Sequence, residues 1–446
     1  MTKAIMNLAF PLMINNLIQT LYNMVDGIWL GRLGATEFAA TTFVSPVIFL
    51  FITVGSGLSA AGTTIMSQML GSGKKKEASG YVFQLFVIGL VLSCAVSVLG
   101  FALSPFVVRG MGATGELASF STTYLSITFL GYPPVLIAFA MAAVMQSQGN
   151  TKAITIASGL SSIVNIILDP IFIFEKIPLI GTPGLNLGVA GAALATIISQ
   201  YVMMLIGIWI VTHYNGDIEV KIKGQKIDKE KIKHLIKIGI PSIIGQSSAS
   251  IGFIVLNVFI TAYGTAVLAA YGVVNRITSL LMMPTMGIGA AIPAIIGQNM
   301  GAKNYDRVRE CFNKSHIISF VVSTAGAFLM YFMAKPMIMI FIRADEIAAL
   351  MPDAMEYIIY SLFIMPMMGG FSVFHGFFQG TGHTEYGMKM SMYRLWLIRL
   401  PMIFVLQRVT NLGASGIWIS MLLSNLFVNI YAYYHYKKDN WMVQVV

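Results

Sequence analysis

The amino-acid sequence predicts an all-α polytopic membrane protein with 12 transmembrane helices, built as two six-helix lobes. Three observations lead there: long apolar stretches, a duplicated pattern, and basic residues confined to alternate loops. The 446 residues are 57% hydrophobic and 10% charged, and the mean hydropathy is +0.77. Charged residues make up about a quarter of a typical soluble chain. Each apolar stretch exceeds the roughly 20 residues that cross a bilayer, and backbone groups in lipid must bond within their own segment, so these stretches are expected to be helices.

Glycine, proline and charged residues divide the apolar stretches into twelve segments. We expect helices at 4–31, 40–70, 80–108, 118–147, 152–175, 187–213, 233–263, 267–300, 308–340, 350–379, 385–409 and 412–436. Several are longer than a bilayer is thick, which predicts tilt, kinks or extension beyond the membrane.

The loop charges predict the orientation. Basic residues gather after the second, sixth and eighth segments and at the C-terminus: Lys74, Lys75, Lys76, Lys221, Lys223, Lys226, Lys229, Lys231, Lys233, Lys303, Arg307, Arg309, Lys437 and Lys438. The alternate loops are poor in lysine and arginine, and the 335–356 stretch offsets two of them with acids: Lys335 and Arg343 against Asp345, Glu346, Asp353 and Glu356. The positive-inside rule therefore predicts a multi-pass protein of the inner (plasma) membrane with both termini cytoplasmic. The same rule accounts for the net charge of +10 without a nucleic-acid partner.

The longest polar stretch divides the chain. It predicts an N-lobe at 1–214, a cytoplasmic linker at 215–232 and a C-lobe at 233–446. The linker lysines suit either anionic lipid or a partner, but a solvated connector is the interpretation we favour.

An internal repeat relates the two lobes. An offset of 230 residues superposes Pro11 on Pro241, Gly34 on Gly264, Gly57 on Gly287, Gln68 on Gln298 and Gly71 on Gly301. Further along, an offset of 231 places Pro170 on Pro401. After a deletion in the loop before the sixth segment, Gly188 and Gly191 match Gly413 and Gly416. Six spans per unit return the chain to the same side, so the repeats are parallel, as in transporters whose two lobes rock about a central cavity.

Two acidic residues are expected deep in the membrane. Asp26 lies in YNMVDGIW and Asp169 in NIILDPIFIF, and the repeat places Leu256 and Leu400 at the matching positions. A charge at membrane depth costs about 3 kcal/mol or more and is rarely idle. Because the repeated fold accepts leucine at both positions, the two acids favour a functional role. The structural alternative is that Asp169 ends a helical turn and Asp26 lies at a wet helix end.

Depth predicts that the two acids share a site. At 1.5 Å per residue, Asp26 lies about 33 Å along the first segment and Asp169 about 27 Å along the fifth. Asn165 lies one turn before Asp169, and Thr196 of the sixth segment enters at a similar level. Two carboxylates, an amide and a hydroxyl suit a hard cation such as Na⁺ or a shared proton.

The remaining features of the sequence favour an ion-driven transporter over a membrane enzyme. Arg276, Arg394 and Arg399 also fall in apolar segments, where they either snorkel or line a cavity. The 30 methionines offer adaptable contacts for varied ligands. Cys94 and Cys311 imply neither a disulfide framework nor a metal motif. Without a P-loop or a clustered catalytic motif, an ion-driven transporter is favoured over a membrane enzyme, and no cofactor is expected beyond the coupling ion.

The chain resembles the multidrug and toxic compound extrusion (MATE) family of the MOP flippase superfamily, in its DinF-like prokaryotic branch. The resemblance covers nearly the whole length and is carried by AFPLMINNLIQTLYNMVDGIWLGRLG, QGNTKAITIASGLSSIVNIILDPIFIF and GVAGAALATIIS. It implies a V-shaped pair of lobes that exports drugs or other amphipathic, often cationic compounds by antiport with H⁺ or Na⁺.

The resemblance also assigns residues. It implies an N-lobe ion site at Asp26, Asn165, Asp169 and Thr196, which would be the metal ligands if Na⁺ is the coupling ion. Tyr124 corresponds to a further cavity residue, and Asn16, Gln19, Arg276, Arg394 and Arg399 are other candidates for the cavity wall. Other branches of the family place essential acids in the C-lobe, and this sequence has no acid deep in the C-lobe segments. The expected partners are small organic molecules and the lipid bilayer, and we expect a monomer.

One alternative stays open within the same superfamily. A flippase for lipid-linked precursors would need a polar or cationic cavity, and Arg394 and Arg399 keep this alternative open.

Overall fold

The computed structural model describes residues 1–178, 180–220, 224–340 and 347–443, and within them the chain is built from α-helices. Apart from an isolated bridge between Lys176 and Pro183, these residues form no β-structure. The predicted loop charges at Lys221, Lys223, Arg343, Asp345 and Glu346 lie outside the described residues.

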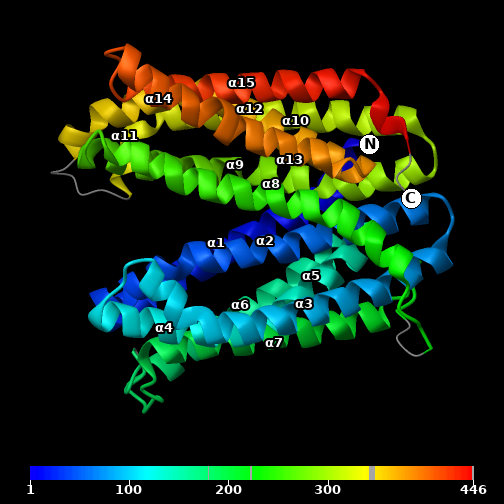
Figure 1. Cartoon of the computed structure of the whole chain (residues 1–446), viewed down its shortest axis with the longest axis horizontal. Helices are drawn as coiled ribbons and strands as arrows, with labels where there is room; N and C mark the ends of the chain where they lie inside the picture. Colours follow the sequence, from blue (N-terminus) through cyan, green and yellow to red (C-terminus); the bar gives the residue numbers. More distant parts are fainter. Residues whose placement is uncertain (179, 221–223, 341–346, 444–446) are drawn as a thin grey trace. The chain divides into compact units, whose positions relative to one another are not determined.

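The first half of the chain forms seven helices (Figure 1). They are α1 Thr2–Leu33, α2 Ala35–Gly71, α3 Lys75–Gly110, α4 Gly115–Leu130, α5 Tyr132–Ser147, α6 Thr151–Ile173 and α7 Gly188–His213. The second half contains α8 Lys229–Thr261, α9 Thr265–Gly301, α10 Tyr305–Phe332, α11 Ala334–Met339, α12 Ile347–Thr381, α13 Thr384–Met392, the π-helical segment η1 Tyr393–Arg399, α14 Leu400–Val409, α15 Ser415–Lys437 and the short η2 Asn440–Met442.

The helices are long and apolar enough to confirm the membrane class. Ten of them in the described residues qualify as spans, or eleven when α4 and α5 count as one span bent by 47°. The predicted span at 385–409 coincides with α13, η1 and α14, which follow one another without a gap but change from α- to π-helix and back, and the number of twelve stays a prediction. The single helices expected at 118–147 and 308–340 are each divided. The first break follows from Pro133 and Pro134, which begin α5 and cannot continue a helix across Gly131.

The duplication is visible in the helix boundaries. Helices α2 and α9 are both 37 residues long, and both are preceded by the glycine at the shared offset, Gly34 and Gly264. Helices α3 and α10 begin at residues that are also 230 positions apart, Lys75 and Tyr305. The repeat in the sequence is therefore a repeat of helices.

The chain forms two compact units. The N-unit comprises Ile14–Gly239, and the C-unit comprises Met1–Met13 with Ile240–Val446. Helix α1 contributes to both units, dividing shortly after Pro11. These are units of packing, and the lobes predicted at 1–214 and 233–446 remain a prediction about transport.

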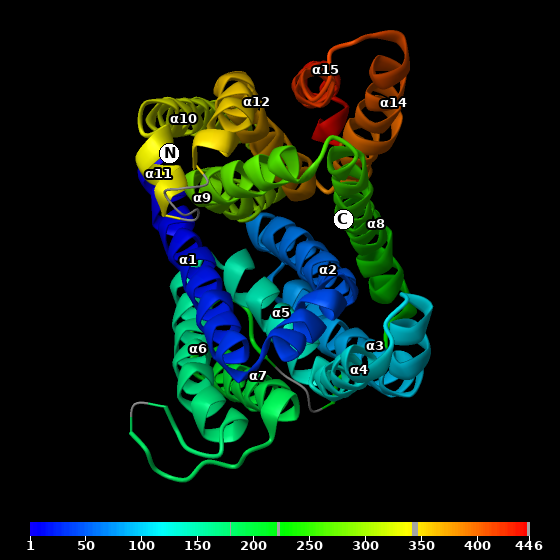
Figure 2. The same ribbon diagram turned by 90° about the vertical axis from the view of Figure 1, so that its left-hand side faces the viewer.

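The N-unit places α6 against α7 and α2 against α4 and α5, as the end-on view shows (Figure 2). One of its apolar cores gathers buried side chains from α1, α2, α4 and α7, among them Leu30, Val44, Leu125 and Ala192. The candidate site is built beside this core.

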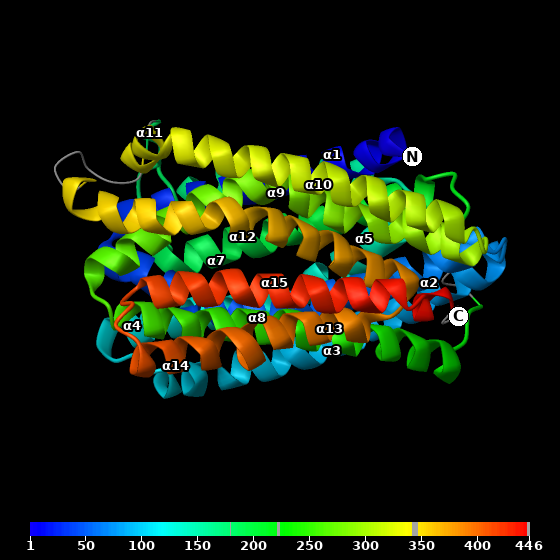
Figure 3. The same ribbon diagram turned by 90° about the horizontal axis from the view of Figure 1, so that it is seen from above.

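In the C-unit, α12 packs against α9, α10 and α15, and α10, α12 and α15 run side by side in Figure 3. One core contains Leu256, Tyr271, Tyr357, Leu400 and Trp418. A second core takes Ile5, Ala9 and Leu12 from the start of α1, which explains why Met1–Met13 belongs to this unit.

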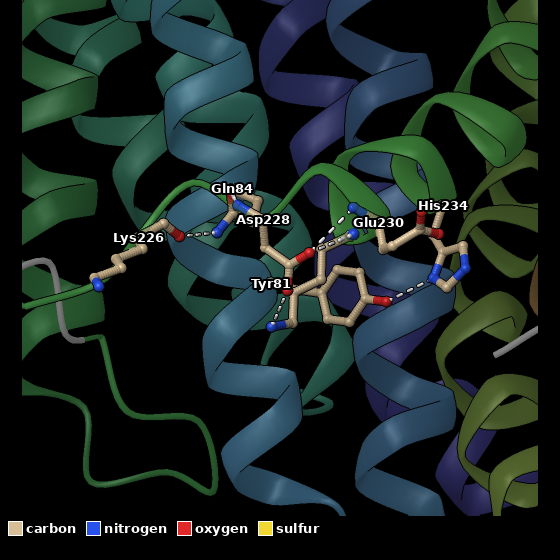
Figure 4. Close-up of polar contacts among 7 residues, drawn as sticks. Tyr81, Gln84, Lys226, Asp228, Glu230 and His234 are labelled. Atoms are coloured by element: carbon tan, nitrogen blue, oxygen red, sulfur yellow. Dashed lines mark hydrogen bonds and ion pairs between the residues drawn. The ribbon is translucent and has the colours of Figure 1, made fainter.

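Hydrogen bonds hold the linker against α3 of the N-unit, although most of its described residues are exposed (Figure 4). Gln84 of α3 donates to the Lys226 carbonyl at 2.8 Å and accepts from the Asp228 N–H at 3.2 Å. The Tyr81 hydroxyl lies 2.8 Å from Nδ1 of His234. The described part of the linker is therefore a docked segment, and α8 begins against α3.

Candidate functional site

The site begins with a polar stripe on α6. Its buried polar residues recur every three or four positions, the spacing that places side chains on one helical face: Ser158, Ser161, Ser162, Asn165 and Asp169. In a helix that crosses lipid, such a face must turn toward protein or a water-filled space.

Asn165 and Asp169 form the innermost pair. Both are fully buried, and the Asn165 amide donates to Asp169 Oδ1 at 3.2 Å. This bond leaves two buried oxygens, Asn165 Oδ1 and Asp169 Oδ2, with no hydrogen-bond partner among the described residues.

Helix α1 supplies the second carboxylate. Asp26 is partly buried, and its Oδ1 also has no partner in the described part of the chain. Asp26 and Asp169 lie close enough for their charges to interact. Neither carboxylate forms an ion pair with any described residue.

Two tyrosines and a threonine complete the surroundings. One turn before Asp26, the Tyr22 hydroxyl lies 3.3 Å from Oγ1 of Thr196, which comes from α7. Tyr124 of α4 is buried within the field of both Asp26 and Asp169. Helices α1, α4, α6 and α7 therefore converge on one place in the N-unit.

A cavity of about 300 Å³ adjoins this place within the N-unit. Tyr22 lines it and also contacts Thr196, so the cavity wall and the acidic pair share a residue. Gln19 spans part of the wall by donating to Ser158 at 3.1 Å. Asn15 and Gln200 line the same cavity. Their side-chain amide oxygens, Oδ1 and Oε1, have no hydrogen-bond partner among the described residues.

This arrangement has the chemistry of a cation site. Three buried oxygens without partners come from two carboxylates and an amide, and hard cations prefer such oxygen ligands. Two carboxylates within each other's field can equally share one proton. Across the described ranges, no three His, Cys, Asp or Glu side chains gather into a cluster for other metals.

The structure places the predicted residues as follows. Asp26, Asn165, Asp169 and Thr196 come together in the N-unit with Tyr124, and Gln19 lines the cavity. Asn16 is absent from the cavity wall, where Asn15 takes its place. Arg394 and Arg399 are buried in the C-unit, whereas Arg276 is exposed on α9 of the isolated chain.

Sequence reasoning missed Tyr22, Asn15, Gln200 and the serines of α6. A signal existed for some of them, since Tyr22 precedes Asp26 by four positions and the α6 serines keep helical spacing with Asn165. No sequence signal indicates that Gln200 faces this cavity.

Comparison with known proteins covers the whole chain. The family model MatE matches residues 11–171 and 241–405, one match in each half. The chain is 25% identical over 452 residues to the probable multidrug resistance protein NorM of Thermotoga maritima, covering 100% of this chain and 94% of that protein. It is 27% identical over 426 residues to the multidrug export protein MepA of Staphylococcus haemolyticus, covering 95% and 90%.

Solved structures agree in fold. A structure described as the outward-facing conformation of a multidrug resistance MATE family transporter of the MOP superfamily superposes with a TM-score of 0.89 at 25% identity, covering 98% of this chain and 95% of that one. A MOP superfamily transporter from Pyrococcus furiosus, described as having a binding pocket of reverse polarity, matches with a TM-score of 0.89 at 24% identity and the same coverage.

Proposed function

Because the chain belongs to the MatE family, we propose that it exports drugs or other amphipathic, often cationic organic compounds in exchange for H⁺ or Na⁺. Members of this family are secondary transporters and not enzymes, and the helices of this chain make it an integral membrane protein. Relatives named as multidrug export proteins support the proposed substrates.

One observation carries the coupling part of the proposal. Buried oxygens of Asp26, Asn165 and Asp169 lack partners in the described chain, and they lie together in the N-unit. At the repeat-matched positions the C-unit has Leu256 and Leu400, both buried in an apolar core. The repeated helices thus fold without these acids, which supports a role for them in holding the coupling ion.

The proposed cycle uses alternating access. Binding of the ion by Asp26 and Asp169, with Asn165 and Thr196 as further ligands, changes how α1 packs in the N-unit. Tyr22 connects that event to the substrate cavity. Pro11 removes a backbone hydrogen bond from α1 close to the point where the helix passes from one packing unit to the other, so α1 bends there most easily.

The proposal also covers the location, topology and oligomeric state of the protein. The protein resides in the plasma membrane with both termini cytoplasmic, and it works as a monomer on small organic substrates without a cofactor. The loop charges support this orientation, and the linker contributes Lys226, Lys229 and Lys231 to them.

Purified protein in proteoliposomes tests the coupling. Efflux of a cationic dye is measured under an imposed Na⁺ gradient and, separately, under an imposed pH gradient. Dye movement driven by one of the two gradients is the expected result and identifies the ion. A rate of dye efflux that is the same with and without each gradient would refute ion coupling.

A second function is favoured by the buried arginines of the C-unit. A flippase for lipid-linked precursors needs cationic groups for phosphate, and Arg394 and Arg399 are such groups. Loss of envelope synthesis on deletion, with unchanged drug sensitivity, would establish this function over drug export.

A further inference from the structure

The two arginines of η1 form a buried cationic pair in the C-unit. Arg394 and Arg399 have exposed fractions of 6% and 2%. Neither forms an ion pair with any acid in the described chain. Burying an arginine at membrane depth without a counter-charge is costly, so such groups normally face a partner of opposite charge.

The π-helical turn places the two arginines together. In an α-helix, positions five residues apart point about 140° away from each other. A π-helix bonds residue i to residue i+5, so Arg394 and Arg399 stand one turn apart on the same side. Their charges act on each other, as expected for neighbours.

The repeat shows that the fold does not require this arrangement. The matching positions in α6, at an offset of 231, are Ile163 and Leu168. Helix α6 is regular α-helix through both positions. The arginines and the π-turn are therefore additions to the C-unit, and π-turns inside α-helices are frequent at functional sites.

The surroundings of Arg394 leave its donors free. The guanidinium lies over the Phe371 ring of α12, 4.1 Å from the centroid, and 6.0 Å from that of Phe253 on α8. Stacking on an aromatic face uses the plane of the group and not its N–H donors. The Nε of Arg394 is buried with no partner, and no hydrogen bond joins its guanidinium to any described residue.

Arg399 is only partly satisfied. Its Nε donates to Ser424 Oγ of α15 at 3.0 Å. Tyr271 and Tyr357 lie within its field, but a phenol hydroxyl carries no charge at neutral pH. The C-unit thus holds two buried positive charges, and no described acid forms an ion pair with either of them.

From this we propose that the C-unit binds an oxyanion, the carboxylate or phosphate group of an amphipathic molecule, at the guanidinium groups of Arg394 and Arg399. The planar fork of arginine matches the two oxygens of such a group, and the flanking phenylalanines suit its apolar part. The inference rests on the transport function proposed above, and it adds compounds with an acidic group to the substrates unless the oxyanion belongs to a membrane lipid.

Binding to the full-length protein in a non-ionic detergent tests the inference. The probes are a dansyl-labelled undecanoic acid and its primary amide, which differ only in the acidic group. Wild-type protein should bind the carboxylate at least about tenfold more tightly than the amide, as expected for a charge-assisted hydrogen bond. Equal affinities would overturn the proposal.

Variants locate the site. Arg394→Gln should lower the carboxylate affinity about tenfold and leave amide binding unchanged. Arg408→Gln is the matched control, because Arg408 also lies over a phenylalanine, 4.0 Å from the Phe404 centroid, yet is exposed at the end of α14. Should Arg394→Gln fail to fold, Arg394→Lys keeps the charge without the fork and should weaken carboxylate binding by a smaller factor. Wild-type affinity in the folded Arg394 variant would overturn the assignment.

Native mass spectrometry distinguishes the two sources of the oxyanion. Phosphatidylglycerol retained by wild type, lost in Arg394→Gln and able to displace the probe would identify a lipid phosphate. Arg394-dependent export of an amphipathic carboxylate without retained lipid would identify the substrate. Absence of both phosphatidylglycerol and probe binding would refute the oxyanion site.

The two proposals can fail separately. Asp26→Asn should abolish efflux and leave probe binding intact. Protein that exports cationic dyes but does not discriminate carboxylate from amide would refute only the oxyanion site. Protein that binds the carboxylate but exports no compound would refute only the transport function.

Discussion

The side chains of Asp169 and Asp26 differ in burial and in their neighbours. Asp169 is enclosed and held by Asn165, whereas Asp26 is partly buried, with Tyr22 one turn away along α1. A fixed carboxylate and a more exposed one make a reasonable pair for an ion that must both bind and leave. The proposed ion site depends on oxygens whose hydrogen bonds are incomplete, because fully bonded oxygens would have no lone pair left for the ion.

Neutralising either acid tests this interpretation. Asp26→Asn and Asp169→Asn keep the shape of the side chain and remove its charge, so efflux in proteoliposomes should fall to the level of vesicles without protein. Glu175→Gln is the control, because Glu175 is an exposed acid just beyond the end of α6. Wild-type efflux in both aspartate variants, at equal reconstitution, would refute the assignment.

Among the helices, a close backbone approach decides how α7 packs on the end of α6. A Cβ atom on Gly191 would collide with the backbone carbonyl of Phe172, at the end of α6 that carries Asp169. Its repeat partner Gly416 is also buried but has room for a Cβ atom, which would lie 3.5 Å from that of Leu406, an ordinary van der Waals distance. The same sequence pattern therefore serves packing in one half only.

We predict that Gly191→Ala lowers the melting temperature and impairs efflux, because a backbone carbonyl cannot move aside as a side chain can. Overpacking of this kind costs about 1–3 kcal/mol. Gly416→Ala should leave both properties nearly unchanged. Thermal unfolding followed by fluorescence compares the two, and equal melting temperatures would show that α6 and α7 do not pack as described.

The start of α8 gives a prediction about pH. Asp228 caps the helix by accepting from the N–H groups of Glu230 at 3.0 Å and Lys231 at 3.3 Å. Figure 4 shows Asp228 beside Glu230 at the start of α8. The Lys231 ammonium, which donates to it at 2.8 Å, holds the pKa of Asp228 below its usual value, and the backbone bonds act in the same direction.

A carboxyl whose pKa is lowered by folding stabilises the fold above its unfolded pKa, and this contribution is lost as pH falls through the folded pKa. Asp228→Ala should therefore lower the melting temperature at neutral pH, and the difference from wild type should shrink on acidification. Asp228→Asn keeps a capping oxygen but does not titrate, so its difference from wild type should be smaller than that of Asp228→Ala and should shrink over the same acid range. A constant difference between wild type and Asp228→Ala across the acid range would contradict the prediction.

For the whole molecule, the two repeated halves carry opposite charges inside. The N-unit buries Asp26 and Asp169, and the C-unit buries Arg394 and Arg399. Each charge has an apolar residue at its repeat-matched position. By the two proposals above, a duplicated scaffold holds a cation site in its N-unit and an anion site in its C-unit.

The orientation of the whole chain can be tested with reporters. Green fluorescent protein fused to the C-terminus should fluoresce, because the loop charges assign this end to the cytoplasm. Alkaline phosphatase inserted at Gly112, in the exposed turn between α3 and α4, should be active, and the same insertion at Gly73 should be inactive. Activity at Gly73 and none at Gly112 would reverse the topology.

Much of this molecule follows from its sequence alone. Apolar length and the cost of unbonded backbone in lipid determine that the segments are helices. The repeat relates the segment of α2 to that of α9, and it identifies Asp26 and Asp169 as additions to a scaffold that accepts leucine. Helical spacing places Asn165 beside Asp169 because one chain segment fixes both positions.

Only the tertiary structure decides what depends on contacts between segments. It brings Tyr22 to Thr196, and it places Asn15 rather than Asn16 on the cavity wall, because the rotation of α1 is set by its neighbours. It docks the linker on α3 and assigns the first turns of α1 to the C-unit core. It also forms the π-turn that places Arg394 and Arg399 on the same side. In a regular α-helix, two residues five positions apart would point in different directions. Local periodicity determines a helix and its faces, whereas its neighbours determine which face meets which.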